Sequence, residues 1–270
     1  MRRCSIVLAL WIALFLAYAF ALSRTDLPIE GALFGAAVTA SLVWFGLVMM
    51  NGARSAMRDL EAREHFLRGS RPRDGEFAAV MGEIRPTFEP LHAPLSGREC
   101  VAYRYDVGHD YIGFAVARCA IHSAHGTIAL GSFPSCSGFD SQSGDAQAYV
   151  DATSFQDLST VMDIAKYTSN LHKQPTPLRI DWRMGAAPAS VRGVESKETI
   201  VASGATVTAY GRYVAAGNEL VSDAKQDLRL VAGAAKGLPP GAMSRLITGF
   251  ALIVIANAGL WVVLGNIASL

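Results

Sequence analysis

The stretch HAPLSGRECVAYRYDV, residues 92–107, places a histidine, a serine and a cysteine within nine positions of one another. A serine or cysteine becomes a nucleophile when a base removes its proton and an oxyanion hole stabilises the intermediate. Neither Ser96 nor Cys100 lies in a G-x-S-x-G frame. His92 belongs to a loop with Pro94, where nearness in sequence fixes no geometry. We therefore interpret the stretch as a turn followed by a strand, and keep a hydrolase using Ser96 or Cys100 as the alternative.

A second group of reactive residues follows with the spacing C-x2-H-x2-H-x10-C, formed by Cys119, His122, His125 and Cys136. Sulfur and imidazole ligands suit zinc, but structural zinc sites usually show C-x2-4-C or H-x3-5-H pairs. If this segment is a strand, Cys119 and His122 point to opposite faces. We expect an irregular loop with buried thiols and no metal or other cofactor, and a metal-binding domain remains the alternative.

Acidic residues that could act as a catalytic pair are scarce. Glu195 and Glu198 are three positions apart, but Arg192 and Lys197 lie beside them, so the pattern indicates a solvated charge cluster. The sequence contains no P-loop, dinucleotide fingerprint or H-E-x-x-H motif. We therefore expect a non-catalytic domain.

Charged residues make up only 17% of the 270 residues, and the net charge is +1. Soluble chains usually carry about 25%. The deficit lies in three long uncharged runs, which predict membrane-spanning helices at about 5–22, 31–50 and 246–270. The first run also resembles a signal peptide, but its apolar stretch is longer than usual, which favours a retained helix. The near-zero charge argues against nucleic acid as a partner.

The basic residues flank these runs on one side only. Arg2 and Arg3 precede the first run, six arginines lie between residues 54 and 73, and Lys236 and Arg245 precede the third run. Basic flanks mark the cytoplasmic side of membrane helices. The pattern predicts a multi-pass protein of a bacterial inner membrane, with its main domain in the cytoplasm.

Small and polar residues in these runs could hold helices together. Gly31 and Gly35 form a G-x3-G pair, and Asn257 lies near the middle of the last run, where it needs a hydrogen-bond partner. We expect packing or self-association through these three residues. The basic segment 51–74, helical over 53–68, is interpreted either as a solvated stalk or as a helix lying against anionic lipid.

Residues 75–241 change to a period of two, which is typical of strands. One helix is expected at 155–167, because Ser154 and Asp157 resemble a capping box. The fold class is therefore a helical membrane anchor plus a mainly-β soluble domain with one helix, a barrel or a sandwich. The predicted strands cover residues 78–85, 100–107, 112–119, 147–153, 178–182, 205–214 and 227–232.

The strand 100–107 carries the most regular alternation of this domain. It predicts Val101, Tyr103, Tyr105 and Val107 on one buried face, with Cys100 on the other. Three cysteines in the domain, an odd number in a reducing compartment, indicate free thiols.

The segments GEIRPTFEPLHAPLSGRECVAYRYDV and ESKETIVASGATVTAYGRYV resemble the GIDE (or BAM, "beside a membrane") domain of MULAN-type membrane E3 ubiquitin ligases and their prokaryotic relatives. The resemblance covers about residues 78–215. The matching residues are Gly82, Pro94, Leu95, Ser96, Gly97, Cys100, Val101, Tyr103, Tyr105, Gly204, Val207 and Gly211.

In that family the domain lies between membrane helices, so the resemblance implies an interaction or scaffolding module beside the membrane. Ligase activity in the family belongs to a zinc-binding RING, and this sequence contains no C-x2-C pair. Two N-terminal helices in place of one are a second departure. The main expectation is therefore a membrane protein that displays a binding domain to a protein partner, and a ligase-type activity is the alternative.

Overall fold

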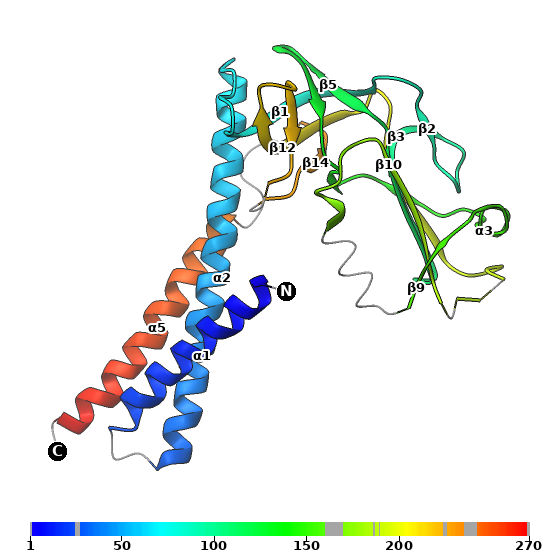
Figure 1. The fold of residues 1–270 in the computed structure, drawn as a ribbon. Coiled ribbons are helices and arrows are strands. Elements are labelled where there is room, and N and C mark those ends of the chain that lie inside the picture. The colour runs from blue at the N-terminus through cyan, green and yellow to red at the C-terminus, as the bar shows by residue number, and fades with distance from the viewer. Residues whose placement is uncertain are drawn as a thin grey trace. The chain divides into compact units, whose positions relative to one another are not determined.

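The structure is a computed structural model that describes residues 2–24, 28–159, 170–185, 187–188, 190–223, 226–234 and 242–268 (Figure 1). The chain divides into two units, which are described separately. The first consists of Met1–Leu60 and Gly237–Leu270, and the second of Glu61–Lys236.

Long helices form the first unit: α1 (Arg2–Leu22), α2 (Ile29–Leu67) and α5 (Ala242–Ala268). Among the described residues, two segments are long and apolar enough to cross a membrane, Ile29–Leu67 and Met243–Val262. The first contains the second predicted span, 31–50, and the second covers only residues 246–262 of the third predicted span, 246–270. The described apolar part of α1, Ala9–Leu22, is shorter.

Helix packing in this unit differs from the glycine pair expected from the sequence. The closest approach is between Gly46 of α2 and Gly249 of α5, where a Cβ on either glycine would lie 2.6–2.7 Å from the carbonyl oxygen of the other. A Cβ on Gly35 would meet Leu22 of α1 at 3.2 Å, whereas Gly31 faces open space apart from Pro28 at 4.0 Å. Small residues therefore do bring two helix backbones together, but the contact is at Gly46, further along α2 than the predicted pair of Gly31 and Gly35.

Asn257 finds the partner that its position in an apolar helix requires. Its Oδ1 accepts a hydrogen bond from the Tyr18 hydroxyl of α1 at 3.2 Å, and its Nδ2 donates to the Ile253 carbonyl at 2.7 Å. Leu22 packs with Ala32 and the neighbouring Ala36 of α2 in a small cluster. Helix α1 therefore contacts both of the other helices.

The second unit contains a closed barrel, formed because β1 pairs with both β5 and β12 (Figure 1). Around the barrel the order is β1-β5-β6-β13-β12, and β14 and β7 extend it from β12. The strands are β1 (Phe77–Pro86), β5 (Cys119–Ser123), β6 (Gly126–Leu130), β7 (Ser135–Ser137), β12 (Thr206–Val214), β13 (Glu219–Val221) and β14 (Arg229–Ala232).

Barrel closure depends on Gly82, because β1 changes partners there. Its first residues pair with β12 and its last ones with β5, so the backbone of β5 comes very close at the crossing. A Cβ on Gly82 would collide with the carbonyl of His122. Glycine inside a strand commonly marks such a bend or close approach.

A second sheet lies in the same unit, with the strand order β8-β11-β3-β4-β10-β9 and with β2 paired to the start of β3. The helix α3 (Gln147–Ala152) precedes β9 in the chain. The strands are β2 (Leu91–His92), β3 (Glu99–Val107), β4 (Tyr111–Val116), β8 (Ser141–Gln142), β9 (Gln156–Leu158), β10 (Leu178–Met184) and β11 (Ser196–Ala202). The mainly-β domain predicted from the sequence is therefore confirmed.

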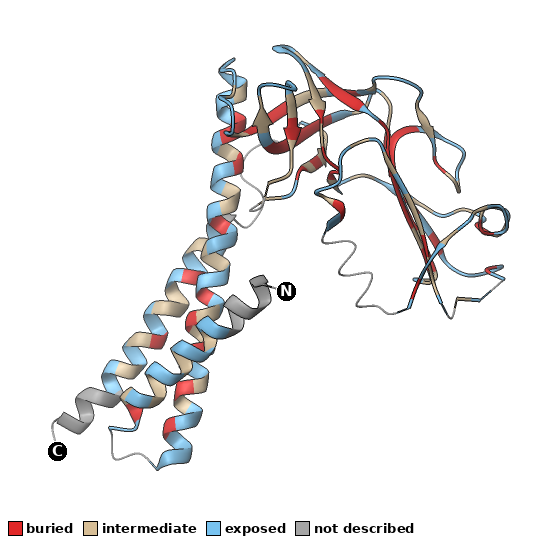
Figure 2. Cartoon of the chain, viewed as in Figure 1, coloured by how far each residue is buried: buried red, intermediate tan, exposed pale blue. Residues whose placement is uncertain are grey.

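The segment Cys100–Tyr103 of β3 is buried on both faces because it separates two hydrophobic clusters, whereas Arg104 further along the strand is exposed (Figure 2). Val101 and Ala102 belong to the cluster shared with the barrel, and Cys100, Tyr103 and Tyr105 to the other. The expected alternation fails at Cys100, which lies with the tyrosines, and at Val101, which lies in the other cluster. The reason is a β-bulge: Val201 pairs with Ala102 and the next residue of β11 pairs with Cys100, so Val101 is an extra residue.

Two of the predicted elements are wrong in type. Residues 147–153, expected as a strand, form α3, where the Gln147 side chain donates to Asp151 one turn later at 2.7 Å. The helix expected at 155–167 begins instead as β9, parallel to β10. Asp157, read as part of a capping box, accepts a hydrogen bond from Arg183 of β10 at 2.8 Å. Residues 160–167 of that prediction lie outside the described residues.

The basic segment after the second span is helical, as expected, up to Leu67. Its end belongs to the second unit, where Ala62 clusters with Ala79 and Tyr210 of the barrel. Phe66 packs edge-on against His125, with ring centroids 5.0 Å apart. Ala62 and Phe66 of this last part of α2 therefore pack against protein, whereas Leu67 is exposed.

Candidate functional site

The turn Pro94–Gly97 joins β2 to β3, and a buried carboxylate holds it. Glu198 of β11 is fully buried. Its Oε1 accepts the backbone N–H of Leu95 at 2.8 Å, and its Oε2 accepts that of Ser96 at 3.1 Å. The expectation that Glu198 belongs to a solvated charge cluster is therefore wrong, because the carboxylate replaces water as the acceptor for two turn amides.

The histidine, serine and cysteine of this stretch do not form a nucleophile with its base. Cys100 is buried, and burial, with a smaller effect of the Glu198 charge, raises the pKa of its thiol to about 12. A thiol with such a pKa is protonated at neutral pH and is a poor nucleophile. The Ser96 Oγ accepts the backbone N–H of Arg98 at 3.4 Å, and His92 is exposed. The stretch is a turn followed by a strand, as the sequence predicts.

The two tyrosines of the motif are buried, and the hydroxyl of one reaches a carboxylate across the sheet. The Tyr105 hydroxyl donates to Asp181 of β10 at 2.7 Å, and the Tyr149 hydroxyl donates to the same oxygen at 2.8 Å. Burial, together with this carboxylate, raises the pKa of Tyr105 far above its usual value, as burial does for Tyr103. Both phenols are therefore neutral, and they stabilise the core.

Glycine residues of the motif occupy positions where the backbone requires them. Gly97 and Gly204 have φ values of +68° and +79°, in the left-handed region. A Cβ on Gly211 would lie 2.7 Å from Leu228 in the barrel core. These three glycines and Gly82 therefore have a structural role, because each lies where the backbone geometry or the packing leaves no room for a side chain or favours a positive φ.

The structure does not bring the four residues of the C-x2-H-x2-H-x10-C pattern together as one site. Cys119 is fully buried in the barrel, whereas His122 and His125 are exposed on β5 and its turn. The His122 ring bonds to Thr127 at 3.2 Å. Burial, with a smaller contribution from Cys136, raises the pKa of the Cys119 thiol to about 12. Within the described residues no group of three potential metal ligands is found.

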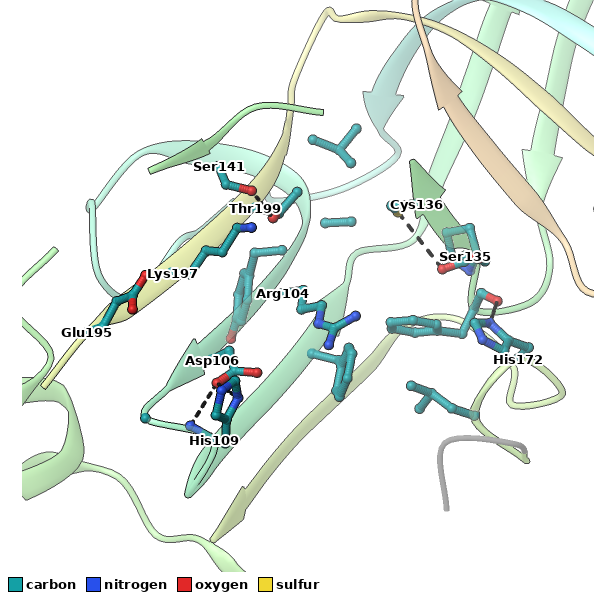
Figure 3. A pocket seen from close by; sticks show the side chains of 18 residues that line it. Arg104, Asp106, His109, Ser135, Cys136, Ser141, His172, Glu195, Lys197 and Thr199 are labelled. Atoms are coloured by element: carbon teal, nitrogen blue, oxygen red, sulfur yellow. Dashed lines mark hydrogen bonds and ion pairs between the residues drawn. The ribbon is translucent and has the colours of Figure 1, made fainter. Parts of the chain in front are cut away.

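A cleft of about 670 Å³ lies over one face of the second sheet (Figure 3). Its floor is the β3–β11 pair, because residues at alternate positions share a face. Directly opposite one another are Ala102 and Val201, then Arg104 and Thr199, then Asp106 and Lys197. The floor therefore changes along its length from apolar to charged.

Aromatic side chains continue the apolar end of this cleft. Phe114 of β4 and Phe133 meet edge-to-face, with ring centroids 6.0 Å apart. The opposite side carries Cys136 of β7 and His172, whose ring lies within 3.3 Å of the Phe133 carbonyl. Cys136 is exposed here, and with Cys100 and Cys119 it is a free thiol, as expected.

At the other end of the cleft, the carboxylate Asp106 has polar partners within the protein, whereas the cations Arg104 and Lys197 are not in ion pairs with described residues. Asp106 accepts the backbone N–H of His109 at 3.0 Å, and the His109 ring lies 3.3 Å from the same oxygen. Arg104 stacks over Phe114, with its guanidinium carbon 5.3 Å from the ring centroid. No ion pair between described residues includes Arg104 or Lys197. Within the part of the chain that the structure describes, these two cations therefore have no carboxylate partner.

Part of this cleft could be predicted from the sequence, namely which of its residues share one face of a strand. Alternation along 100–107 places Arg104 and Asp106 on one face, and alternation along 196–202 does the same for Lys197 and Thr199. What the sequence did not reveal is that the two segments pair, nearly a hundred residues apart, in the register that brings these side chains together.

No family model, curated protein or solved structure matches this chain. The resemblance to the GIDE domain therefore remains a prediction that rests on the motif residues. The arguments for a function come from the fold and from the cleft.

Proposed function

We propose that this protein is a multi-pass membrane protein that displays a β-rich binding module, with the cleft over β3 and β11 as the site for a partner protein. The observation that carries the proposal is the cleft itself. Its volume of about 670 Å³ is that of a typical ligand site, roughly 300–1,000 Å³, and its lining is apolar at one end and charged at the other.

The membrane part of the proposal comprises three helices, α1, α2 and α5. Large apolar side chains such as Phe34, Phe250 and Trp261 are exposed, as expected for surfaces that face lipid. The contact of Tyr18 with Asn257 supports α1 as a permanent member of the anchor, because cleavage would leave that amide without this donor. The basic flanks favour a cytoplasmic domain in a bacterial inner membrane.

The family part of the proposal is that the domain is of GIDE type and acts as a scaffold without catalysis of its own. It is supported by the role of the motif residues. Glu198, which holds the turn at Leu95 and Ser96, lies on β11 between Lys197 and Thr199 of the cleft floor. The motif therefore fixes the strand that presents the cleft.

The test is affinity purification of the full-length protein in mild detergent, followed by mass spectrometry. The wild type is compared with Ser135→Trp, which fills the cleft from β7, and with Ser137→Trp, an exposed position on the same strand that does not line it. We expect a stoichiometric partner with the wild type and with Ser137→Trp, and its loss with Ser135→Trp. Recovery of the same partner with Ser135→Trp would show that it binds elsewhere, and a wild-type protein without any partner would refute the binding module.

Orientation is tested separately, with a membrane-impermeant maleimide applied to intact spheroplasts. Burial raises the pKa of the native Cys136 thiol to about 12, which slows its reaction with maleimide, so the probe is Ser137→Cys at the next, exposed position of β7. We expect labelling of Ser137→Cys beyond the wild-type level only after the membrane is opened. Labelling of Ser137→Cys in intact spheroplasts would place the domain outside.

A further inference from the structure

Resting on the proposed binding module, we infer that the cleft recognises a carboxylate next to an apolar side chain, on a peptide segment of the partner. Arg104 and Lys197 bind the carboxylate, and Phe114 and Phe133 contact the apolar side chain.

The first step of the argument is that Arg104 is oriented but not neutralised. Its guanidinium carbon lies 5.3 Å from the centroid of the Phe114 ring, so a cation–π contact holds the group at the cleft. A guanidinium presents paired donors that match the two oxygens of a carboxylate. Among the described residues no acidic group takes up these donors.

The second step is that Lys197 lies close to Arg104 on the same face. Arg104 is directly opposite Thr199, and Lys197 is two residues before Thr199 on β11. Such diagonal neighbours have Cβ atoms roughly 7–8 Å apart, so two long side chains can both reach an anion placed between them. Asp106 lies opposite Lys197, and its Oδ1 contacts both the backbone N–H and the ring of His109. Within the described residues neither cation has an ion-pair partner, so both can contribute to binding of the same ligand.

The third step concerns the charge of the ligand. The charged residues that line the cleft are Arg104 and Lys197 and, beside them, the carboxylates of Asp106 and Glu195, so the formal charges of the lining sum to zero. A site with two cations and two nearby carboxylates suits a single negative charge better than a dianion such as phosphate, because the carboxylates repel the second charge. The chemistry therefore favours a carboxylate.

The fourth step concerns what carries the carboxylate. Beside the apolar floor, the cleft presents the hydroxyls of Ser141 and Thr199, which lie 2.7 Å apart, and Ser135 on the opposite side. Hydroxyls both donate and accept, so they suit the amides of a peptide backbone. A hydrocarbon chain would desolvate these groups without replacing their hydrogen bonds. A peptide segment is thus a better match than a fatty acid.

The experiment uses the full-length protein in lipid nanodiscs and isothermal titration calorimetry with three dipeptides. N-acetyl-leucyl-phenylalanine has a C-terminal carboxylate, its C-terminal amide is neutral, and N-acetyl-glutamyl-phenylalanine amide has the carboxylate in a side chain. We expect binding of one or both acids, at least about tenfold tighter than that of the neutral amide, from charge-assisted hydrogen bonds. Which acid binds better distinguishes a chain terminus from an acidic side chain.

Variants of the two cations assign the binding to the cleft. We expect Arg104→Gln and Lys197→Gln each to weaken binding of the acid about tenfold and to leave the amide unchanged. Arg104→Lys, which keeps the charge but loses the paired donors, should be intermediate. Arg212→Gln on the barrel is the matched control, because Arg212 is exposed and does not line the cleft. The thermal unfolding midpoint of each variant verifies that it is folded.

Several results would overturn the inference. Equal binding of the neutral amide would exclude carboxylate recognition, and unchanged binding by Arg104→Gln and Lys197→Gln would exclude this site. Absence of binding by all three dipeptides to the wild type at millimolar concentration would also contradict it. If the partner is still captured through the cleft in that last case, the inference on the carboxylate fails alone and the binding module stands.

Discussion

Substitution of the buried Glu198 should reduce the stability of the domain strongly, although its charged neighbours in the sequence suggest a solvated residue. We predict that Glu198→Ala destabilises the second unit strongly, because the backbone N–H groups of Leu95 and Ser96 lose their acceptors. Replacement by glutamine, which has the same shape but one oxygen, should cost about half as much, since one of the two amides keeps its partner.

The size of the effect follows from the two hydrogen bonds. A hydrogen bond to a charged group contributes roughly 1.5–3 kcal/mol. Leu95 is half-buried and Ser96 is exposed, so water can partly replace the carboxylate and the lower value applies. Two bonds then give about 3 kcal/mol for Glu198→Ala and about 1.5 kcal/mol for Glu198→Gln. In a unit of this size, 1 kcal/mol lowers the unfolding midpoint by about 2–4 °C, so the expected losses are about 6–12 °C and 3–6 °C.

The assay is thermal unfolding of the full-length protein in detergent, and the control is the neighbouring glutamate. Glu195 is exposed, so Glu195→Ala should change the unfolding midpoint by no more than about 2 °C. If Glu198→Ala were no more destabilising than Glu195→Ala, the carboxylate would not be holding the turn. A loss of equal size in Glu198→Gln and Glu198→Ala would assign the effect to charge rather than to the number of acceptors.

Three further predictions concern other parts of the chain. Burial raises the pKa of the Cys119 thiol from about 9 to about 12 in the folded state, so its contribution to stability is complete below pH 9 and is lost between pH 9 and 12, by up to about 1.4 kcal/mol per pH unit. Cys119→Ser should make the alkaline decline in unfolding midpoints shallower without abolishing it, because the pKa values of Cys100 and Cys136 are raised in the same way, and an unchanged slope would contradict the assignment. A Cβ at Gly113 would overlap the Tyr105 ring, so Gly113→Ala should cost about 1–3 kcal/mol, and a double-mutant cycle should show this cost disappearing with Tyr105→Ala. Gly46→Leu should lower the thermal stability of the helical unit, whereas Gly52→Leu, with open space around the glycine, should not; equal effects would refute the close helix contact.

Much of the β-rich architecture could be predicted because alternation is a local property. The strand over 100–107 stands out because its polar and apolar residues alternate, and the structure places β3 there. The faces were harder to assign. A bulge at Val101 adds one residue to the strand, and from that point each side chain moves to the other face. Nothing in the residues around Val101 indicates such an insertion.

The errors in helices and in the site arise from pairing between distant segments. The residues around Asp157 favour a helix locally, but the segment pairs with the edge of β10, where Arg183 donates a hydrogen bond to Asp157. These tertiary contacts outweigh the local helix propensity. Glu198 looks solvated beside Lys197, because the turn that buries it lies a hundred residues earlier in the chain. The types of residue that could line a cleft can thus be selected from the sequence. Which of them lie opposite one another depends on the register of β3 and β11, which the sequence alone does not reveal.

Closure of the barrel between β1 and β12 also has a consequence for synthesis of the protein. Phe77 pairs with Arg212, so the first strand to leave the ribosome must wait for one of the last. At translation rates of roughly 5–20 residues per second, that interval lasts on the order of ten seconds. Throughout it, the apolar side of β1 has no barrel to enter and is open to chaperones or to wrong partners. Ribosome-bound chains that stop before β12 should therefore be protease-sensitive in the barrel strands β1, β5 and β6.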